Sequence, residues 1–137
     1  MPTTTVRYVT ERQFVGTDGR GQAVLLSGDG NAGGVSPSQM LLIALSSCTG
    51  VDVSDIMKKK RKPLDMLEIT AIGEQDPDPP WAYRKVHLRY RVSGKEITEK
   101  ALSQAIDLSL NKYCSVAATV RGVAELTTDF EILSADQ

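Results

Sequence analysis

The stretch that decides the fold is SPSQMLLIALSSCTGVDVSDIMKKKR, residues 36–61. Ser36 can cap a helix, Pro37 suits its first turn, and Gln39 completes a capping box three residues after the cap. The basic residues at the end of the stretch favour the negative end of a helix dipole, and Pro63 cannot continue the helix. The sequence therefore predicts a long helix, and its nearly all-apolar first turns predict that it is central and well covered.

The segments on either side of this helix predict strands and two further helices. A hairpin is expected before the helix because glycines surround an Asp-Gly step, and apolar residues alternate with polar ones in the strands expected after it. The expected order is ββαββααβ, an α+β fold in a single domain over residues 1–137. The remaining elements are strands at 3–14, 22–27, 64–74 and 83–93, a helix at 98–113, a short helix at 115–121 and a final strand at 123–133.

Composition excludes several classes of partner. With 16 basic and 17 acidic residues and a formal net charge of -1, the chain of 137 residues has no single-signed field that would attract nucleic acid or an anionic membrane. The N-terminus lacks the apolar stretch of a signal peptide, and the longest apolar run, residues 40–45, is far shorter than a membrane span. We therefore expect a cytoplasmic protein with no membrane partner.

The only two cysteines, Cys48 and Cys114, are the candidate reactive groups. Cys114 directly precedes a predicted helix, whose unpaired N–H groups favour a thiolate and lower the pKa of a thiol. Cys48 lies among small residues that leave room for a substrate, although free cysteines are often inert and buried. Asp52, four residues after Cys48, is expected to be structural or to hold a basic group. Since zinc needs three or four ligands and His87 is the only histidine, no metal is expected.

Five segments resemble the OsmC/Ohr family of osmotically inducible and organic hydroperoxide resistance proteins, in particular its YhfA-like branch. They are SPSQMLLIALSSCT at 36–49, VDV at 51–53, KKKR at 58–61, DLS at 107–109 and KYCSVA at 112–117. The resemblance implies an OsmC-like fold, an intertwined homodimer in which two central helices pack together and are flanked by antiparallel sheets. It also implies active sites at the subunit interface. With this resemblance, the interpretation that both thiols are inert is no longer favoured.

By this resemblance Cys48 is the peroxidatic thiol, which reduces a hydroperoxide and becomes a sulfenic acid, and Cys114 resolves it as a disulfide. An external dithiol then reduces the disulfide, with no metal or bound cofactor. The family's activating arginine lies in the N-terminal hairpin turn, where Arg20 is the nearest candidate. This chain departs from the organic-hydroperoxide-specific members at Ser38, where they have a glutamate that positions this arginine.

Two other functions remain open from the sequence. The dimer could bind a small apolar ligand in a cleft lined by the cysteines, without significant peroxidase turnover. Separately, Trp81, Tyr83 and Tyr113 are candidates for the lining of an apolar pocket, although such residues are more often simply packed. It could also be a stress-associated structural protein whose buried thiols do not react. The sequence therefore favours a thiol peroxidase acting on organic peroxides or hydrogen peroxide, and thiol chemistry separates it from both alternatives.

Overall fold

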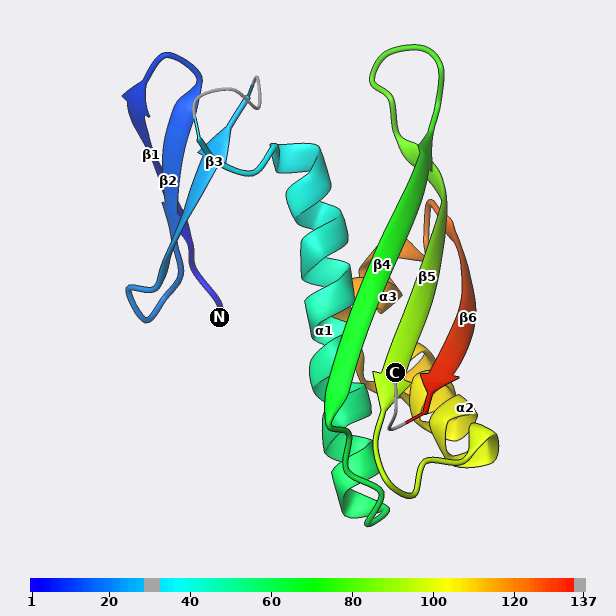
Figure 1. Cartoon of the computed structure of the whole chain (residues 1–137). Coiled ribbons are helices and arrows are strands. Elements are labelled where there is room, and N and C mark those ends of the chain that lie inside the picture. The colour runs from blue at the N-terminus through cyan, green and yellow to red at the C-terminus, as the bar shows by residue number, and fades with distance from the viewer. Residues whose placement is uncertain (29–32, 135–137) are drawn as a thin grey trace. The chain divides into compact units, whose positions relative to one another are not determined.

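The computed structural model describes residues 1–28 and 33–134, and the chain divides into two compact units. The first unit is Met1–Leu41 and the second is Leu42–Gln137, so the boundary falls just inside the long central helix. Figure 1 shows the strands and helices of both units. The prediction of a single domain over 1–137 stays a prediction.

The first unit is an antiparallel sheet of three strands in the order β1-β2-β3. Its strands are β1 (Thr5–Thr10), β2 (Gln13–Thr17) and β3 (Ala23–Ser27). The predicted turn after β2 is present: the Asp18 carboxylate accepts the backbone N–H groups of Arg20 at 2.8 Å and Gln22 at 2.9 Å. Gly21 takes a φ of 83°, which costs glycine little, so the Asp-Gly pattern marked this turn correctly.

The prediction of one strand over 3–14 is wrong, because the chain makes an extra hairpin turn inside it. Glu11 and Arg12 both have positive φ values, 34° and 42°, and this turn joins β1 to β2. Two-residue hairpin turns of this kind are normally signalled by asparagine or glycine, and neither is present here. An edge-to-face contact of the Tyr8 and Phe14 rings, with centroids 5.7 Å apart, stabilises the hairpin.

The long helix is α1 (Pro37–Lys59), and both of its ends are fixed by local hydrogen bonds. Ser36 Oγ accepts the backbone N–H of Gln39 at 3.3 Å, as the capping box predicts. The helix ends two residues earlier than expected, because Arg61 adopts a left-handed φ of 61°. The next N–H, of Lys62, then bonds to the Met57 carbonyl at 2.9 Å, which closes the helix with a Schellman motif.

The second unit contains a sheet in the order β4-β5-β6, with the helices on one face (Figure 1). Strand β4 (Met66–Gln75) runs antiparallel to β5 (Tyr83–Ser93), whereas β6 (Glu125–Leu133) runs parallel to β5. The expectation of purely antiparallel sheets is therefore wrong for β6. The reason is the helical segment after β5, which carries the chain back to the starting end of that strand.

The segment between β5 and β6 forms three consecutive helical pieces. They are α2 (Glu99–Leu108), the π-helical turn η1 (Ser109–Tyr113) and α3 (Ser115–Val120). Thr98 caps α2 by accepting the N–H of Ala101 at 3.1 Å. The sequence predicted one helix over 98–113, but its last turn is widened into a π-helix, and this feature has no clear signature in sequence.

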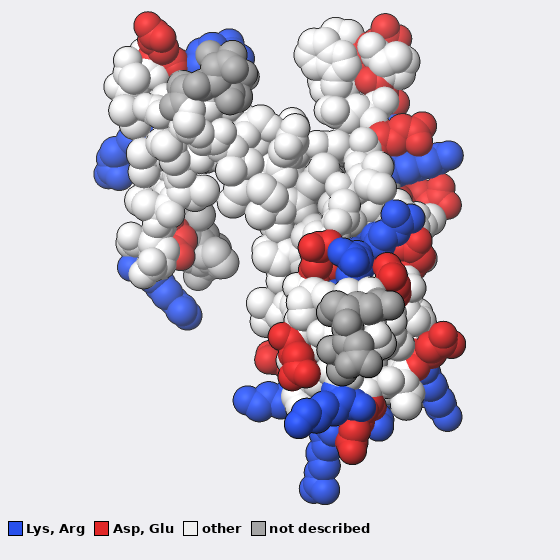
Figure 2. Space-filling model, in the orientation of Figure 1, with Lys and Arg blue, Asp and Glu red and all other residues white. Residues whose placement is uncertain are grey.

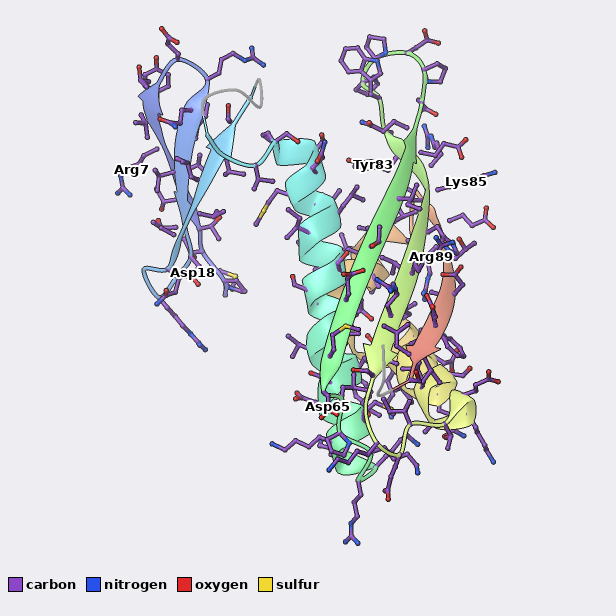
Figure 3. All side chains as sticks on the ribbon, viewed as in Figure 1. Arg7, Asp18, Asp65, Tyr83, Lys85 and Arg89 are labelled. Carbon is purple, nitrogen blue, oxygen red and sulfur yellow. The ribbon has the colours of Figure 1, made fainter. Side chains whose placement is uncertain are left out.

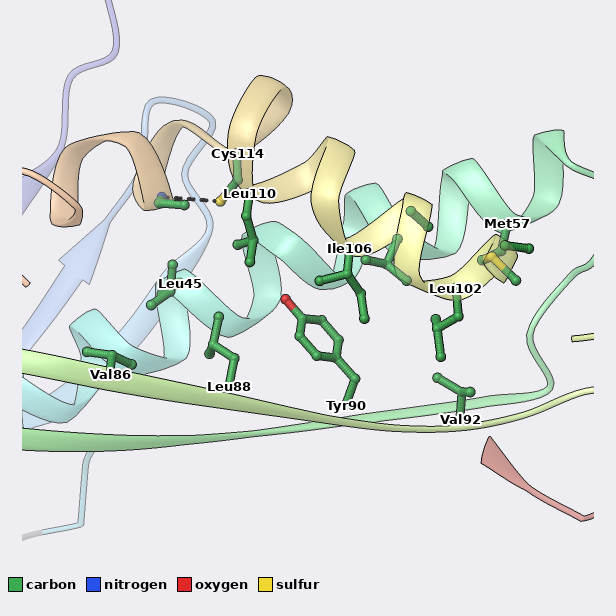
Figure 4. Close-up of a cluster of buried hydrophobic side chains, with 14 of the residues drawn as sticks. Leu45, Met57, Val86, Leu88, Tyr90, Val92, Leu102, Ile106, Leu110 and Cys114 are labelled. Carbon is green, nitrogen blue, oxygen red and sulfur yellow. Dashed lines mark hydrogen bonds between the residues drawn. The ribbon is translucent and has the colours of Figure 1, made fainter. Parts of the chain in front are cut away.

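The core of the second unit lies between the sheet and these helices (Figure 4). Helix α1 contributes one side at four-residue spacing, as expected for an amphipathic helix that packs on a sheet. The buried residues of α1 are Leu45, Thr49, Val53 and Met57, and those of β5 are Val86, Leu88, Tyr90 and Val92. Because every second residue of β5 is buried, the opposite face of this sheet is left for charged side chains.

Among the described residues, α1 is the one helix that is long and apolar enough to cross a membrane by length and composition. Its most apolar 18-residue window has a mean hydropathy of 1.5, and 22% of that window is buried within the chain. The sequence argument from the short run at 40–45 missed this property, because Ser46 and Ser47 end the run while the average over 18 residues stays apolar. One such helix is weak grounds for a membrane span, since the core helix of a globular protein passes the same test.

Candidate active site

Cys48 lies at the middle of α1, on the border between core and surface. Its side chain is half-buried, and the next residue, Thr49, is completely buried. The preceding serines satisfy their hydroxyl groups inside the helix: Ser46 bonds to the Leu42 carbonyl at 2.9 Å, and Ser47 bonds to the carbonyl of Ile43. The thiol is therefore the reactive group that this part of the helix presents.

Cys114 lies at the junction of η1 and α3 and is only 3% exposed. Its backbone N–H donates to the Ser109 carbonyl at 2.7 Å, which closes the π-helical turn. Its sulfur accepts the backbone N–H of Ala117 at 3.3 Å, so Cys114 is the N-cap of α3 (Figure 4). The backbone thus fixes the position of the thiol from both sides.

The structure brings the two cysteines together, although they are 66 positions apart in sequence (114 minus 48). Both are free thiols, and Cys48 is one of the groups that raise the pKa of the Cys114 thiol, so the two side chains are neighbours. This arrangement is the one that a disulfide between the two thiols requires.

The expectation that Cys114 is poised as a thiolate is wrong. Burial, followed by the hydrogen bond with Cys48, raises the pKa of the Cys114 thiol to about 11, from an ordinary value of 9.0. The N–H of Ala117 acts in the opposite direction, as the helix-terminus argument predicted, but its effect is smaller. Removal from water outweighs one helix N-terminus, so Cys114 is protonated at neutral pH.

A second set of polar side chains connects the two cysteine segments, and the sequence did not assign it. We call Tyr90, Thr49, Ser109 and Asp52 the hydroxyl network. Thr49 Oγ1 lies 2.8 Å from Tyr90 Oη and 2.8 Å from Ser109 Oγ, which lies 2.8 Å from Asp52 Oδ2. Asp52 is thus structural, one of the two roles expected for it, and its hydrogen-bond partner is a serine rather than a basic group. Three of its four residues lie in family-like segments, Thr49 at 36–49, Asp52 at 51–53 and Ser109 at 107–109, and this is the sequence signal that could have pointed to the network.

Tyr90 of β5 projects from the sheet into the helical layer, with its hydroxyl directed toward α1 (Figure 4). Burial raises the pKa of Tyr90 to about 12, and the nearby Cys114 and Asp52 act in the same direction. The tyrosine is therefore a neutral hydrogen-bond donor across the physiological range. Its hydroxyl lies close enough to Cys114 to sense a charge there.

Arg20, the expected activating residue, lies in the first unit, in the turn between β2 and β3. Its side chain is exposed, and its guanidinium makes no hydrogen bond or ion pair with any described residue. The other turn arginine, Arg12, donates from Nη2 to the Gly28 carbonyl at 3.0 Å. In the described part of the second unit, no lysine or arginine is hydrogen-bonded to either thiol. The role of Arg20 stays a prediction.

His87 lies on the charged face of the β4-β5-β6 sheet, away from the cysteines. Its Nδ1 is 2.7 Å from Thr127 Oγ1 and its Nε2 is 3.2 Å from Asp129, which also pairs with Arg89. Arg89 and Lys85 project from β5 in Figure 3, and Figure 2 shows basic and acidic groups alternating along this side. Within residues 1–28 and 33–134, no group of three or more potential ligands could hold a metal ion.

The aromatic residues considered for an apolar pocket do not form one in the described structure. Trp81 and Tyr113 are each 55% exposed, whereas the Tyr83 ring packs where a side chain on Gly73 would be. A hollow with an apolar lining lies on the sheet of the first unit, between Val6, Val24 and Leu26, and it contains no cysteine. This hollow is therefore not a cleft lined by the cysteines.

The two thiols should differ in their reaction with iodoacetamide. We expect Cys48 to be alkylated at pH 8 because it is half-exposed, and Cys114 to be protected by burial and by its raised pKa. Since a raised pKa means less thiolate at every lower pH, labelling of Cys114 should increase only as the pH approaches about 11. Mass spectrometry of the peptides gives the labelled fraction at each site.

Protein unfolded in denaturant is the control for this labelling, because both thiols should then react at similar rates. Equal labelling of Cys48 and Cys114 in the folded protein at pH 8 would show that the environment of Cys114 is not the one described.

Comparison with known proteins bears on the fold and the family of this chain. The family description "OsmC-like protein" matches residues 28–129. Protein YhfA of Escherichia coli K12 is 29% identical over 130 residues, covering 95% of this chain and 97% of its own length. A hypothetical protein from Aquifex aeolicus has a crystal structure that is 30% identical, with a TM-score of 0.87 and coverage of 98% of this chain and 97% of that one.

A more distant structure has the same fold. The organic hydroperoxide resistance protein OhrB of Bacillus subtilis is 14% identical, with a TM-score of 0.63 over 96% of this chain and 98% of its own. At this identity the likeness concerns the fold alone. Together with the family match over most of the chain, it confirms the predicted α+β fold of the OsmC type, and the chain belongs to the OsmC-like protein family.

Proposed function

We propose that the protein is a thiol peroxidase that reduces organic hydroperoxides, or hydrogen peroxide, through Cys48 and Cys114. The observation that carries this proposal is the placement of a partly buried thiol, Cys48, beside a buried, protonated one, Cys114. A peroxide can reach the partly exposed Cys48 more readily than the buried Cys114, which supports Cys48 as the site of the first attack. Cys114 is held beside it, where it can react with the product.

The proposed cycle consists of an oxidation of Cys48, a condensation with Cys114 and a reduction of the resulting disulfide. The Cys48 thiolate attacks the terminal oxygen of ROOH, the O–O bond breaks, and the alkoxide leaves as ROH after taking up a proton. Cys48 is oxidised by two electrons to a sulfenic acid. Cys114 sulfur then displaces hydroxide, which leaves as water with the Cys114 proton, and an S–S bond forms. An external dithiol reduces this disulfide by exchange, as a reducing cytoplasm would require.

The family gives this chemistry further support. Organic hydroperoxide resistance proteins are among the structural neighbours, and we extend their named function to this chain. No step of the proposed cycle requires a metal or a bound cofactor.

We further propose that the protein works as a homodimer. Helix α1 leaves Ile43 46% and Val51 61% exposed, although it is the one described helix that is long and apolar enough to cross a membrane. A bilayer is a poor environment for this helix, because Asp52 and Asp55 would enter the hydrocarbon. A second copy of the chain can cover the same face and also bring Arg20 to a cysteine pair.

Sedimentation equilibrium should therefore give twice the mass of one chain, and a monomer at all concentrations would contradict the dimer.

Arg20 is proposed as the cation that stabilises the Cys48 thiolate in the assembled protein. Replacing it in Arg20→Ala should slow the reaction of Cys48 with cumene hydroperoxide about tenfold at pH 7, because a neighbouring cation favours the charged form of a thiol. Arg20→Lys should retain part of the rate. Stopped-flow measurements of thiol loss would give these rates.

Arg7→Ala is the matched control for Arg20, since Arg7 is also an exposed arginine of the first unit and lies on β1 (Figure 3). Equal rates in Arg20→Ala and the wild type would remove Arg20 from the mechanism and leave the two-cysteine cycle intact.

The peroxidase proposal is tested by counting thiols before and after one equivalent of cumene hydroperoxide. We expect the wild-type chain to lose both thiols together, because sulfenic acid formation is followed by disulfide formation. In Cys114→Ser, Cys48 should still be oxidised and should be trapped as the sulfenic acid by dimedone.

Both other functions predict that the number of thiols does not change. A dimer that only binds an apolar ligand would keep both thiols in the presence of the peroxide, and so would a structural protein with inert cysteines. In a structural protein with inert cysteines, neither thiol would react with a thiol reagent until the protein is unfolded. An unchanged thiol count would overturn the proposal.

A further inference from the structure

The hydroxyl network joins three elements through groups that are removed from water. Thr49 and Ser109 are both completely buried, and Tyr90 is buried beside them. Thr49 comes from α1, Tyr90 from β5 and Ser109 from the start of η1. Buried hydroxyl groups that lose their partners are costly, so these contacts fix the position of η1 against α1.

Ser109 is the hydroxyl group at the centre of the network. Its Oγ is the donor to two acceptors at 2.8 Å, Thr49 Oγ1 and Asp52 Oδ2, so its one hydroxyl proton is shared between them. Thr49 Oγ1 also lies 2.8 Å from Tyr90 Oη, and either of these two hydroxyl groups can donate to the other. Thr49 is thus hydrogen-bonded both to the sheet and to the start of η1.

Ser109 is the residue that links this network to Cys114. Its hydroxyl bonds to Thr49 and Asp52 of α1, whereas its carbonyl accepts the backbone N–H of Cys114 at 2.7 Å. Thr49 directly follows Cys48 in the same helix. Ser109 is thus hydrogen-bonded both to α1, the helix that carries Cys48, and to the backbone of Cys114.

We propose that Thr49 and Ser109 are positioning residues for disulfide formation, which hold the Cys114 segment against Cys48 through their paired hydroxyl groups. The inference rests on the proposed two-cysteine cycle and identifies what makes the second step fast. Neither residue touches the peroxide. They act by raising the effective concentration of one thiol at the other, in the way that a short linker does.

This effective concentration can be measured without peroxide. Protein dithiol and glutathione disulfide exchange to give the Cys48–Cys114 disulfide and two reduced glutathione molecules, and the equilibrium constant reports how closely the thiols are held. We expect Thr49→Val, which keeps the side-chain shape but removes the hydroxyl, to lower this constant at least about tenfold, the factor that corresponds to 1.4 kcal/mol. Ser109→Ala should lower it to a similar extent.

A conservative variant separates positioning from simple packing. Thr49→Ser keeps the hydroxyl and loses only a methyl group, so its exchange constant should lie within about threefold of the wild-type value if the hydrogen bond is the cause. Ser54→Ala is the matched control in the same helix, because the Ser54 hydroxyl bonds only to the Val51 carbonyl at 3.0 Å. Circular dichroism confirms that each variant is folded, and Ser109→Ala takes the place of Thr49→Val if the latter does not fold.

Two results would overturn the inference: a Thr49→Val constant equal to that of the wild type, or a Thr49→Ser constant reduced as much as that of Thr49→Val. Either result would leave the peroxidase proposal standing, since that proposal depends on thiol loss with peroxide. Conversely, an absence of peroxide chemistry would leave the exchange equilibrium measurable and this inference open to the same test.

Discussion

The packing of α1 against the β4-β5-β6 sheet is the constraint on which the rest of the second unit depends. Four residues at four-residue spacing, Leu45, Thr49, Val53 and Met57, are completely buried and fix the rotation of the helix about its axis. This rotation leaves Cys48, next to Thr49, at the edge of the core. It also leaves apolar residues such as Val51 on the outside, where the second copy of the proposed homodimer would cover them.

A buried polar group in this interface has to be satisfied, and the way it is satisfied gives the site its shape. Thr49 has no partner within α1 and meets Tyr90 of β5 and Ser109 of η1 instead. The widened π-helical turn places the Ser109 carbonyl against the N–H of Cys114. Hydrogen bonds in the core therefore bring together two cysteines that the sequence separates widely. π-helical turns often mark functional sites, and this one ends at the proposed resolving thiol.

The parts of this arrangement that depend on neighbouring residues could be predicted from sequence. The cap at Ser36, the Asp-Gly turn and the long helix follow from local patterns, and the family resemblance paired the two cysteines. The extra turn at Glu11–Arg12 could not be predicted, because neither residue usually adopts a positive φ. The hydroxyl network was missed because Thr49 and Ser109 are far apart in sequence. The pKa of Cys114 was misjudged because burial, which sequence does not show, outweighs the helix terminus.

The central claim is that Cys48 and Cys114 of one chain form the disulfide that completes the cycle, and peptide mapping tests it most directly. The protein is treated with one equivalent of cumene hydroperoxide, then unfolded and digested without reductant, and its peptides are identified by mass spectrometry. We predict a single linked pair that joins the Cys48 and Cys114 peptides, in protein that migrates as one chain on a non-reducing gel. A Cys48 oxidised to sulfinic or sulfonic acid beside a free Cys114, or linked to a second chain, would contradict the account.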